Sequence, residues 1–272
     1  MSYRTIMVQM LNDEAIDQRV EASVALARRC DAHLFGVHVV PPPTMPMGYG
    51  EAAAYVGPEM IEAQRRSSQE VADRLTECFR RHTEGGTVAA SWRVDDGDPA
   101  TCYAAHARTA DLCVVPQLRQ SGIDALAPEL AEQLIVDAGG PVLMLPRGSG
   151  ASVGRRVLVG WSGRKESARA LRDALPFLEK AEEVELVTVG DATGLFLDEA
   201  VEALARHGLR PRGRVVEGRD DAGPALLEQA GTMRADLLVM GAYGHSRLRE
   251  LIFGGATHHV LEHADLPVLF SC

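Results

Sequence analysis

The residues of this chain best suited to chemistry are two groups of glycines in one stretch near the C-terminal end, Asp236-Leu-Leu-Val-Met-Gly-Ala-Tyr-Gly-His-Ser-Arg-Leu-Arg-Glu-Leu-Ile-Phe-Gly-Gly-Ala-Thr257. An apolar run leads into Gly241 and Gly244, and the pair Gly254-Gly255 opens a helix-like segment. Glycines at such junctions let the main chain approach a ligand and leave helix N-terminal N–H groups free. Because these groups favour anions such as phosphate, the stretch predicts a nucleotide-binding site.

The chain contains the same series of motifs twice, in the same order. Ala110-Asp-Leu-Cys-Val-Val-Pro matches Ala235-Asp-Leu-Leu-Val-Met-Gly, and Pro141-Val-Leu-Met-Leu matches Pro267-Val-Leu-Phe-Ser. A preserved order indicates an internal duplication. We therefore predict a first domain at 1–147 and a second at 154–272, joined by a linker of small and polar residues. The first half has an extra loop near 41–58, rich in Pro, Gly and Met, which is either a surface excursion or a lid or interface arm.

Both halves alternate short apolar runs with helical patterns, which predicts an α/β fold. This order gives right-handed crossovers and two doubly wound, mostly parallel five-stranded sheets. In such sheets ligands bind beyond the carboxyl ends of the strands. In the second half the expected strands are Arg156–Gly160, Val184–Val189, Arg214–Glu217, Asp236–Met240 and Val268–Phe270, and the expected helices are Ser167–Leu178, Leu197–His207, Ala225–Gly231 and Thr257–His263.

The composition argues against several classes of function. A net charge of −10 over 272 residues, with a pI near 5.4, disfavours a grip on nucleic acid or on anionic membranes. The five cysteines are odd in number and form no CxxC, so we expect no disulfide framework, and Cys113 in its apolar run should be a core residue. No apolar run reaches the length of a membrane span. We expect a cytoplasmic protein without nucleic-acid or membrane partners.

The glycine stretch resembles the nucleotide-binding motif of the universal stress protein family, and the chain is similar to a tandem member with two such domains. The family pattern is G-x2-G-x9-G-[ST]; Gly241, Gly244 and Gly254 have its spacing, and Pro267-Val-Leu matches the family's final strand. The resemblance covers nearly all of both halves except the extra loop. It implies a Rossmann-like fold of the adenine nucleotide alpha hydrolase type.

The ligand implied by this resemblance is ATP, with or without Mg²⁺, in the second half. Members that bind ATP place the triphosphate and ribose against the two glycine elements and the adenine near the end of the first strand. Carried over position by position, the implied site residues are Gly160, Trp161, Ser162, Met240, Gly241, Gly244, His245, Gly254, Gly255, Ala256 and Thr257.

Two positions depart from the family pattern. Gly255 stands where Ser or Thr is usual, although Thr257 offers a hydroxyl two residues later. Ser162 stands where many nucleotide-binding members have an Asp that contacts the base, and a hydroxyl is the weaker acceptor. Two further side chains, those of Trp161 and His245, each allow two interpretations. Trp161 either stacks on adenine or belongs to the core, and His245 either touches a phosphate or only begins a helix.

The first half lacks the glycine elements. The run Pro116–Arg119 stands where Gly241–Gly244 stands in the second half, and Pro128-Glu129 lies near the place of the helix-opening pair. Proline has no N–H, and side chains block the approach of a ligand to the main chain. We predict that the first half binds no nucleotide and pairs with the second as an internal pseudo-dimer, through Val142–Leu145 and Val268–Phe270. Whether two whole chains also form a homodimer is left open.

Histidines crowd the expected last helix. His259 and His263 are spaced i, i+4 and either share a metal or lie on a solvated face with His258. No third ligand is identified, so we predict no metal site.

Charged residues near the predicted site are interpreted as a solvated surface. Glu166, Arg172 and Asp173 are expected to be surface charges on the first helix of the second half. Arg247 and Arg249 are expected on a solvated face, within reach of a γ-phosphate.

No catalytic residue is assigned. The chain has no GxSxG elbow, no P-loop lysine and no carboxylate that the sequence places in the pocket, so slow ATP hydrolysis or self-phosphorylation is the most that we expect. The leading hypothesis is a stress-response module that binds an adenine nucleotide and signals occupancy through its shape. The alternatives are a scaffold or partner-binding stress protein with a vestigial pocket, and a slow ATPase.

Overall fold

The computed structural model describes residues 2–42, 58–86, 88–117, 127–150, 152–217, 222–243 and 255–272. The first half contains β1 (Thr5–Gln9), α1 (Ile16–Cys30), β2 (His33–Val40), α2 (Pro58–Thr83), β3 (Ala90–Asp96), α3 (Pro99–Ala107), β4 (Leu112–Pro116), α4 (Ala127–Asp137) and β5 (Val142–Leu145). The second half contains β6 (Arg156–Gly160), α5 (Lys165–Asp173), α6 (Leu175–Leu178), β7 (Glu183–Val189), α7 (Leu197–Ala205), β8 (Arg212–Val216), α8 (Ala222–Met233), β9 (Leu237–Gly241), α9 (Gly255–His263) and β10 (Val268–Ser271).

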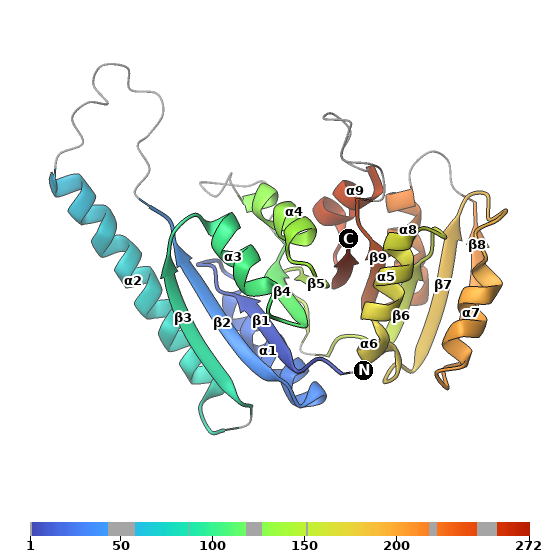
Figure 1. Cartoon of the computed structure of the whole chain (residues 1–272), viewed down its shortest axis with the longest axis horizontal. Helices are drawn as coiled ribbons and strands as arrows, with labels where there is room; N and C mark the ends of the chain where they lie inside the picture. The colour runs from blue at the N-terminus through green and yellow to red at the C-terminus, as the bar shows by residue number, and fades with distance from the viewer. Residues whose placement is uncertain are drawn as a thin grey trace, which may run out of the picture.

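The strands of the described residues form one continuous sheet in the order β3-β2-β1-β4-β5-β10-β9-β6-β7-β8 (Figure 1). Each half contributes five parallel strands, and the halves join where β5 and β10 run antiparallel, with Leu269 opposite Leu143. This confirms the predicted α/β class with mostly parallel, doubly wound halves. The expected pairing of the two last strands occurs within the chain.

Helices cover both faces of the sheet, and the apolar pattern of the strands explains why. Successive strand residues point to opposite faces. In β1, Ile6 and Val8 pack in one core with helices α1, α2, α5, α6 and α7, whereas Met7 packs in the other with α3, α4, α8 and α9. Cys113 is buried in this second core, as predicted. A strand buried on both faces reads as a continuous apolar run, as the sequence does here.

One expected helix is divided in the structure, and another is longer than expected, since α8 spans Ala222–Met233 where the sequence predicted Ala225–Gly231. The helix expected over Ser167–Leu178 is broken at Ala174 into α5 and α6, because Pro176 has no N–H to continue the ladder. The expected loop near 41–58 falls mostly on residues 43–57, which lie outside the described part. After it α2 is 26 residues long, against nine for its counterpart α7, and runs along the β3 edge (Figure 1).

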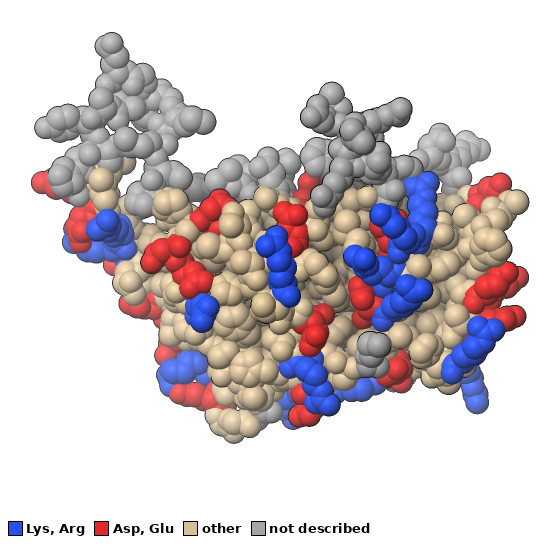
Figure 2. Space-filling view, in the orientation of Figure 1, with Lys and Arg blue, Asp and Glu red and all other residues tan. Residues whose placement is uncertain are grey.

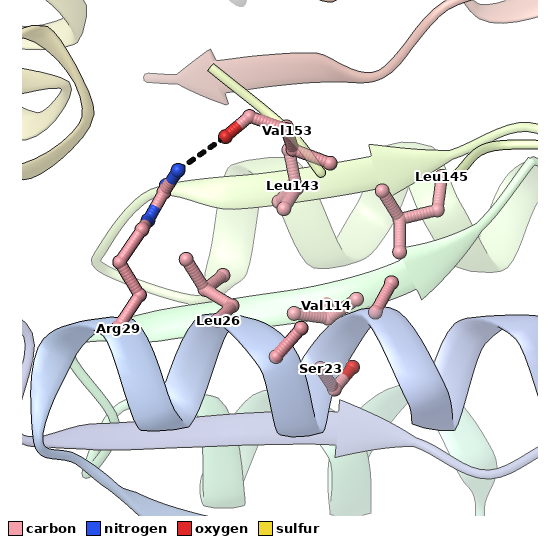
Figure 3. Close-up of a pocket in the computed structure, with 9 residues that line it drawn as sticks. Ser23, Leu26, Arg29, Val114, Leu143, Leu145 and Val153 are labelled. Atoms are coloured by element: carbon pink, nitrogen blue, oxygen red, sulfur yellow. Dashed lines mark hydrogen bonds between the residues drawn. The ribbon is translucent and has the colours of Figure 1, made fainter. Parts of the chain in front are cut away.

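Side chains of α1 and of the segment before β1 contact the second half directly. Tyr3 donates from its hydroxyl to the carbonyl of Asp173 at 2.5 Å and packs edge-on against Phe177. Arg29 lies over the same ring and donates to the Val153 carbonyl at 2.5 Å, beside a small cavity of about 20 Å³ between α1 and the strands β4 and β5 (Figure 3). Such a cavity has room for about one water molecule. The two halves are therefore connected by packed side chains as well as by the sheet.

The surface carries mixed charge. On the face seen in Figure 2, acidic and basic side chains are interspersed among the described residues. In that described part, no helix is both long and apolar enough to cross a membrane.

Candidate functional site

A cavity of about 500 Å³ opens in the second half at the carboxyl ends of β6, β7 and β9. After β6 the chain builds β7 and β8 on one side and then returns to build β9 and β10 on the other. The cavity therefore lies at the point where the strand order reverses, which is where doubly wound sheets bind ligands. The first turns of α8 and α9 border it.

The structure brings together all of the predicted site residues that it describes. The cavity is lined by Gly160, Trp161, Ser162, Met240, Gly241, Gly255, Ala256 and Thr257. Thr257 is buried in the first turn of α9, so a hydroxyl is available near the position where Gly255 lacks one. Gly244, His245 and Gly254, together with Arg247 and Arg249, lie outside the described residues.

Gly241 is required by packing between elements. A Cβ on this residue would lie 2.6 Å from main-chain atoms of Glu166 and Ser167, at the start of α5. Real Cβ atoms do not approach main chain so closely, so a side chain here would displace the helix. The glycine that the sequence assigns to ligand approach thus also lets α5 reach β9.

Trp161 is fixed in place on three sides. Its main-chain N–H donates to the Val187 carbonyl at 2.8 Å, its carbonyl accepts from the Thr188 hydroxyl at 3.0 Å, and its indole N–H donates to the Leu195 carbonyl at 2.7 Å. The ring is half-buried against the core and also lines the cavity. The geometry therefore agrees in part with each interpretation of Trp161, since the ring both packs against the core and lines the cavity.

The end of β7 turns main-chain groups toward the cavity. Val187 bonds to the β6 side of the sheet, and peptide groups two residues apart face the same side. The N–H and C=O of Val189 therefore point to the side of β7 on which β6 lies. Strand β6 has already ended at Gly160. Val189 lines the cavity. The sequence analysis missed this residue, although the end of any strand neighbouring β6 could have been inferred to border the site.

Two carboxylates reach the cavity, which corrects the expectation that none would. Glu166 was expected on the surface, but it is 7% exposed and lines the cavity, because α5 begins against Gly241. Its Oε1 lies 3.5 Å from Lys165 Nζ. Asp191 also lines the cavity, from the exposed loop after β7, where hydrogen bonds from Thr193 hold the pKa of its carboxyl below the usual value.

Asp173 was also expected to be a surface charge, and this is wrong. It is half-buried at the end of α5 and accepts a hydrogen bond from the Ser271 hydroxyl at 2.8 Å. Burial raises the pKa of its carboxyl above the usual value, against the hydrogen bond that lowers it. Arg172 is exposed, as predicted.

Side chains fill the equivalent place in the first half. Gln9 occupies the last position of β1, which corresponds to Gly160 in β6, and it is fully buried. The Tyr103 hydroxyl accepts from the N–H of Val39, the counterpart of Val189, at 3.2 Å. The buried Arg19 donates to the Gln9 carbonyl at 3.0 Å.

The sequence that replaces the glycine turn begins with Pro116, the last residue of β4, and Gln117. The side-chain amide of Gln117 donates to two carbonyls near the end of α9, those of Leu261 and Ala264, both at 2.9 Å. This part of the first half therefore contacts the helix that begins at the candidate site. Leu118 and Arg119 lie outside the described residues, as do the side chains of Pro128 and Glu129.

The histidines of α9 contact one another and the first half. The rings of His259 and His263 stack with centroids 4.3 Å apart, and His263 Nδ1 bonds to the His259 carbonyl. His258 lies 3.2 Å from Glu132 of α4. In the described part of the chain, no third ligand atom joins this stacked pair.

Comparison with known proteins identifies relatives of both halves. A family model described as "Universal stress protein family" matches residues 2–146 and again residues 154–271. The structure of a universal stress protein from Archaeoglobus fulgidus DSM 4304 resembles this one with a TM-score of 0.73, at 15% identity, over 98% of this chain and 97% of that chain. A functionally unknown protein from Pseudomonas aeruginosa PAO1 resembles it with a TM-score of 0.60, at 16% identity, over 99% and 92% of the two chains. At these identities the likeness shows the fold.

One curated relative matches in sequence over a short stretch. Universal stress protein Slr1230 of Synechocystis is 56% identical to this chain over 34 residues. The match spans 12% of this chain and 12% of the length of that protein.

Proposed function

Because the chain belongs to the universal stress protein family, we propose that it is a stress-response protein that binds ATP in the cavity of its second half. The observation that carries the proposal is the convergence of the described site residues on one cavity at the switch point of the sheet. A volume of about 500 Å³ lies within the range of small-ligand sites. The first half serves as the structural partner of this domain.

Adenine fits the part of the cavity between β6 and β7. The N–H and C=O of Val189 can pair with the edge of a base, and the half-buried ring of Trp161 offers an apolar face close by. In the first half the Tyr103 hydroxyl already bonds to the equivalent main-chain N–H, at Val39, and Gln9 takes the adjacent space. This contrast supports a single nucleotide site in the chain.

The phosphates fit at the start of α9. The first N–H groups of this helix have no partner within it, and the helix dipole favours negative charge there. Gly255 and Ala256 leave the main chain accessible, and Thr257 adds a hydroxyl. Glu166 and Asp191 add negative charge to the cavity, which disfavours phosphates, and Mg²⁺ bound with the nucleotide would offset that repulsion. We therefore propose the magnesium complex of ATP as the ligand.

A melting experiment tests the proposal. ATP with Mg²⁺ at a hundredfold excess over Kd should stabilise the folded chain by about 2.7 kcal/mol, which raises the melting temperature by several degrees. GTP at the same concentration is the control, because it has the same phosphates but a different base edge. An absence of any shift with ATP, or an equal shift with both nucleotides, would contradict adenine recognition.

A partner-binding scaffold is the second candidate. It is favoured by Ser162 and Gly255 in place of the usual side chains and by the carboxylate of Glu166 in the cavity. Recovery of one adenine nucleotide per chain from gently purified protein would exclude it. A slow ATPase is the third candidate, since Glu166 and Asp191 supply the carboxylates that the sequence alone did not place in the pocket. ATP turnover that is unchanged by Glu166→Gln and by Asp191→Asn would exclude a catalytic role of these carboxylates.

A further inference from the structure

Three side chains that can bind a metal meet between α1 and α2, on the opposite half of the molecule from the nucleotide cavity. Cys78 and His82 lie one turn apart on α2, and Asp17 lies in the first turn of α1. Cys78 Sγ is 3.7 Å and His82 Nε2 is 2.9 Å from the same atom, Asp17 Oδ1. One ligand atom of each residue lies within 4.8 Å of the others, and in the described residues no other group of three does so.

The donor set suits Zn²⁺. Thiolate, imidazole and carboxylate are its usual protein ligands, at about 2.3, 2.0 and 2.1 Å in tetrahedral geometry. These bond lengths place sulfur about 3.6 Å, and nitrogen about 3.4 Å, from the carboxylate oxygen. The Cys78 to Asp17 separation already has this value, and the His82 to Asp17 hydrogen bond must open by about half an ångström.

Burial prepares the site without completing it. Cys78 is 6% exposed and His82 is half-buried, whereas Asp17 is exposed. Zn²⁺ binding would form a sulfur–zinc bond and release the thiol proton to solvent. The open side at Asp17 leaves the fourth coordination position to water.

Arg81 is the charged neighbour that opposes a cation at this place. Its guanidinium contacts Asp17 Oδ1, the same oxygen that Cys78 and His82 approach. A divalent ion bound to Oδ1 would have to displace this contact, for instance toward the second oxygen of the carboxylate. Without a metal, Asp17 is thus an acceptor for three donors.

We propose that Asp17, Cys78 and His82 form a Zn²⁺ site with three protein ligands that fastens the C-terminal turns of α2 to the start of α1. The site is independent of the nucleotide cavity. It would fix the end of a helix whose exposed first turns run past the rest of the first half.

Titration of the chelator-treated full chain tests the site, with Zn²⁺ followed by calorimetry and Co²⁺ followed by absorption. We expect one ion per chain, release of a proton on Zn²⁺ binding, and a thiolate-to-cobalt absorption band in the near ultraviolet. Cys78→Ser should abolish that band. It should also weaken Zn²⁺ binding by more than the ~10–100-fold that loss of an outer-shell partner costs. Cys30→Ser is the matched control, since Cys30 is also buried but lies outside the cluster.

Two exposed positions keep the test decisive if Cys78→Ser destabilises the fold. Asp17→Asn should weaken Zn²⁺ binding, and Arg81→Gln should strengthen it by removing the competing positive charge. The proposal is overturned if Zn²⁺ does not bind stoichiometrically, or if Cys78→Ser and Cys30→Ser have equal effects. It also fails if binding is lost only in His263→Gln, which would place the metal at the stacked histidines.

Discussion

The two halves differ in the residue that ends their first strand. Gln9 in β1 and Gly160 in β6 occupy equivalent places, and they pair with Val37 and Val187 in the same register. The side-chain amide of Gln9 is fully buried and has no hydrogen-bond partner in the described part of the chain, which costs free energy. Gly160 instead lines the cavity, where a Cβ on this residue would lie 3.1 Å from Leu226 Cδ1. We propose that side-chain volume at this position, as much as the absence of the glycines, keeps nucleotide out of the first half.

Replacing Ser162 by Asp should increase the affinity of the cavity for ATP. Ser162 lines the cavity and is exposed, so a larger polar side chain fits without disturbing the core. Ser162→Asp restores the carboxylate that contacts the base in many members of the family, and a charged acceptor bonds more strongly than a neutral one. We expect ATP to bind roughly tenfold more tightly, because an added charge-assisted hydrogen bond contributes about 1.5 kcal/mol or more. Calorimetric titration measures the change, with Ser162→Ala as the control, and an unchanged Kd for the Asp variant would contradict the adenine placement.

The hydroxyls of Tyr103 and Tyr243 predict opposite responses to one substitution. Tyr103 accepts from the Val39 N–H, so Tyr103→Phe leaves a buried donor unpaired and should cost about 1–3 kcal/mol in the free energy of unfolding. Among the described residues the buried hydroxyl of Tyr243 has no hydrogen-bond partner, so Tyr243→Phe should be neutral or stabilising. Urea unfolding of both variants measures the difference. Equal losses would show that the Tyr103 hydrogen bond does not stabilise the first half.

At the scale of elements, the strands were the most predictable feature. The ends of β6 and β10 fall within a residue of the prediction, because short apolar runs bounded by polar residues mark buried strands. The break between α5 and α6 was missed, since the apolar pattern continues through Pro176. The inward position of Glu166 could not be predicted, because it depends on how closely α5 approaches Gly241. The periodicity of a sequence predicts helices and strands, but it does not give the distances between them.

The contact between Asp173 at the end of α5 and Ser271 in β10 predicts that the free energy of unfolding depends on pH. The raised pKa of Asp173 means that the folded chain binds this proton more tightly than the unfolded chain does. This residue's contribution to the unfolding free energy therefore increases as the pH falls through the folded pKa. Asp173→Asn keeps an acceptor for Ser271 and removes the buried charge.

Asp173→Asn should accordingly be more stable than the wild type at neutral pH, with the advantage shrinking in acid, where the wild-type carboxyl is protonated. Denaturant unfolding at several pH values measures this difference. Glu179→Gln, at an exposed position just after α6, is the control for loss of a surface charge. A variant that is less stable than the wild type at neutral pH would contradict the direction of the shift.

At the scale of the whole molecule, the two halves share one sheet and packed side chains. The β5–β10 pairing is buried, and Tyr3, Arg29 and Gln117 bond across the halves. A unit that buries its junction in this way should unfold cooperatively.

The two tryptophans make this testable, because Trp92 lies in β3 and Trp161 follows β6. Single-tryptophan variants, Trp92→Phe and Trp161→Phe, report on the second and first half respectively. We expect each variant to show the same urea midpoint by fluorescence and by far-ultraviolet circular dichroism. Separate midpoints within one variant would show that the halves unfold independently.

We propose that one ATP binds per chain, in the second half, where Gly160 stands at the end of the first strand in place of the buried Gln9. Calorimetric titration of ATP with Mg²⁺ into the wild type and into Gly160→Gln tests this directly, with Gln9→Gly as the reciprocal variant. We expect one site per chain in the wild type, loss of binding in Gly160→Gln with the fold retained by circular dichroism, and an intact site in Gln9→Gly. Two sites in the wild type, or unchanged affinity in a folded Gly160→Gln, would contradict it.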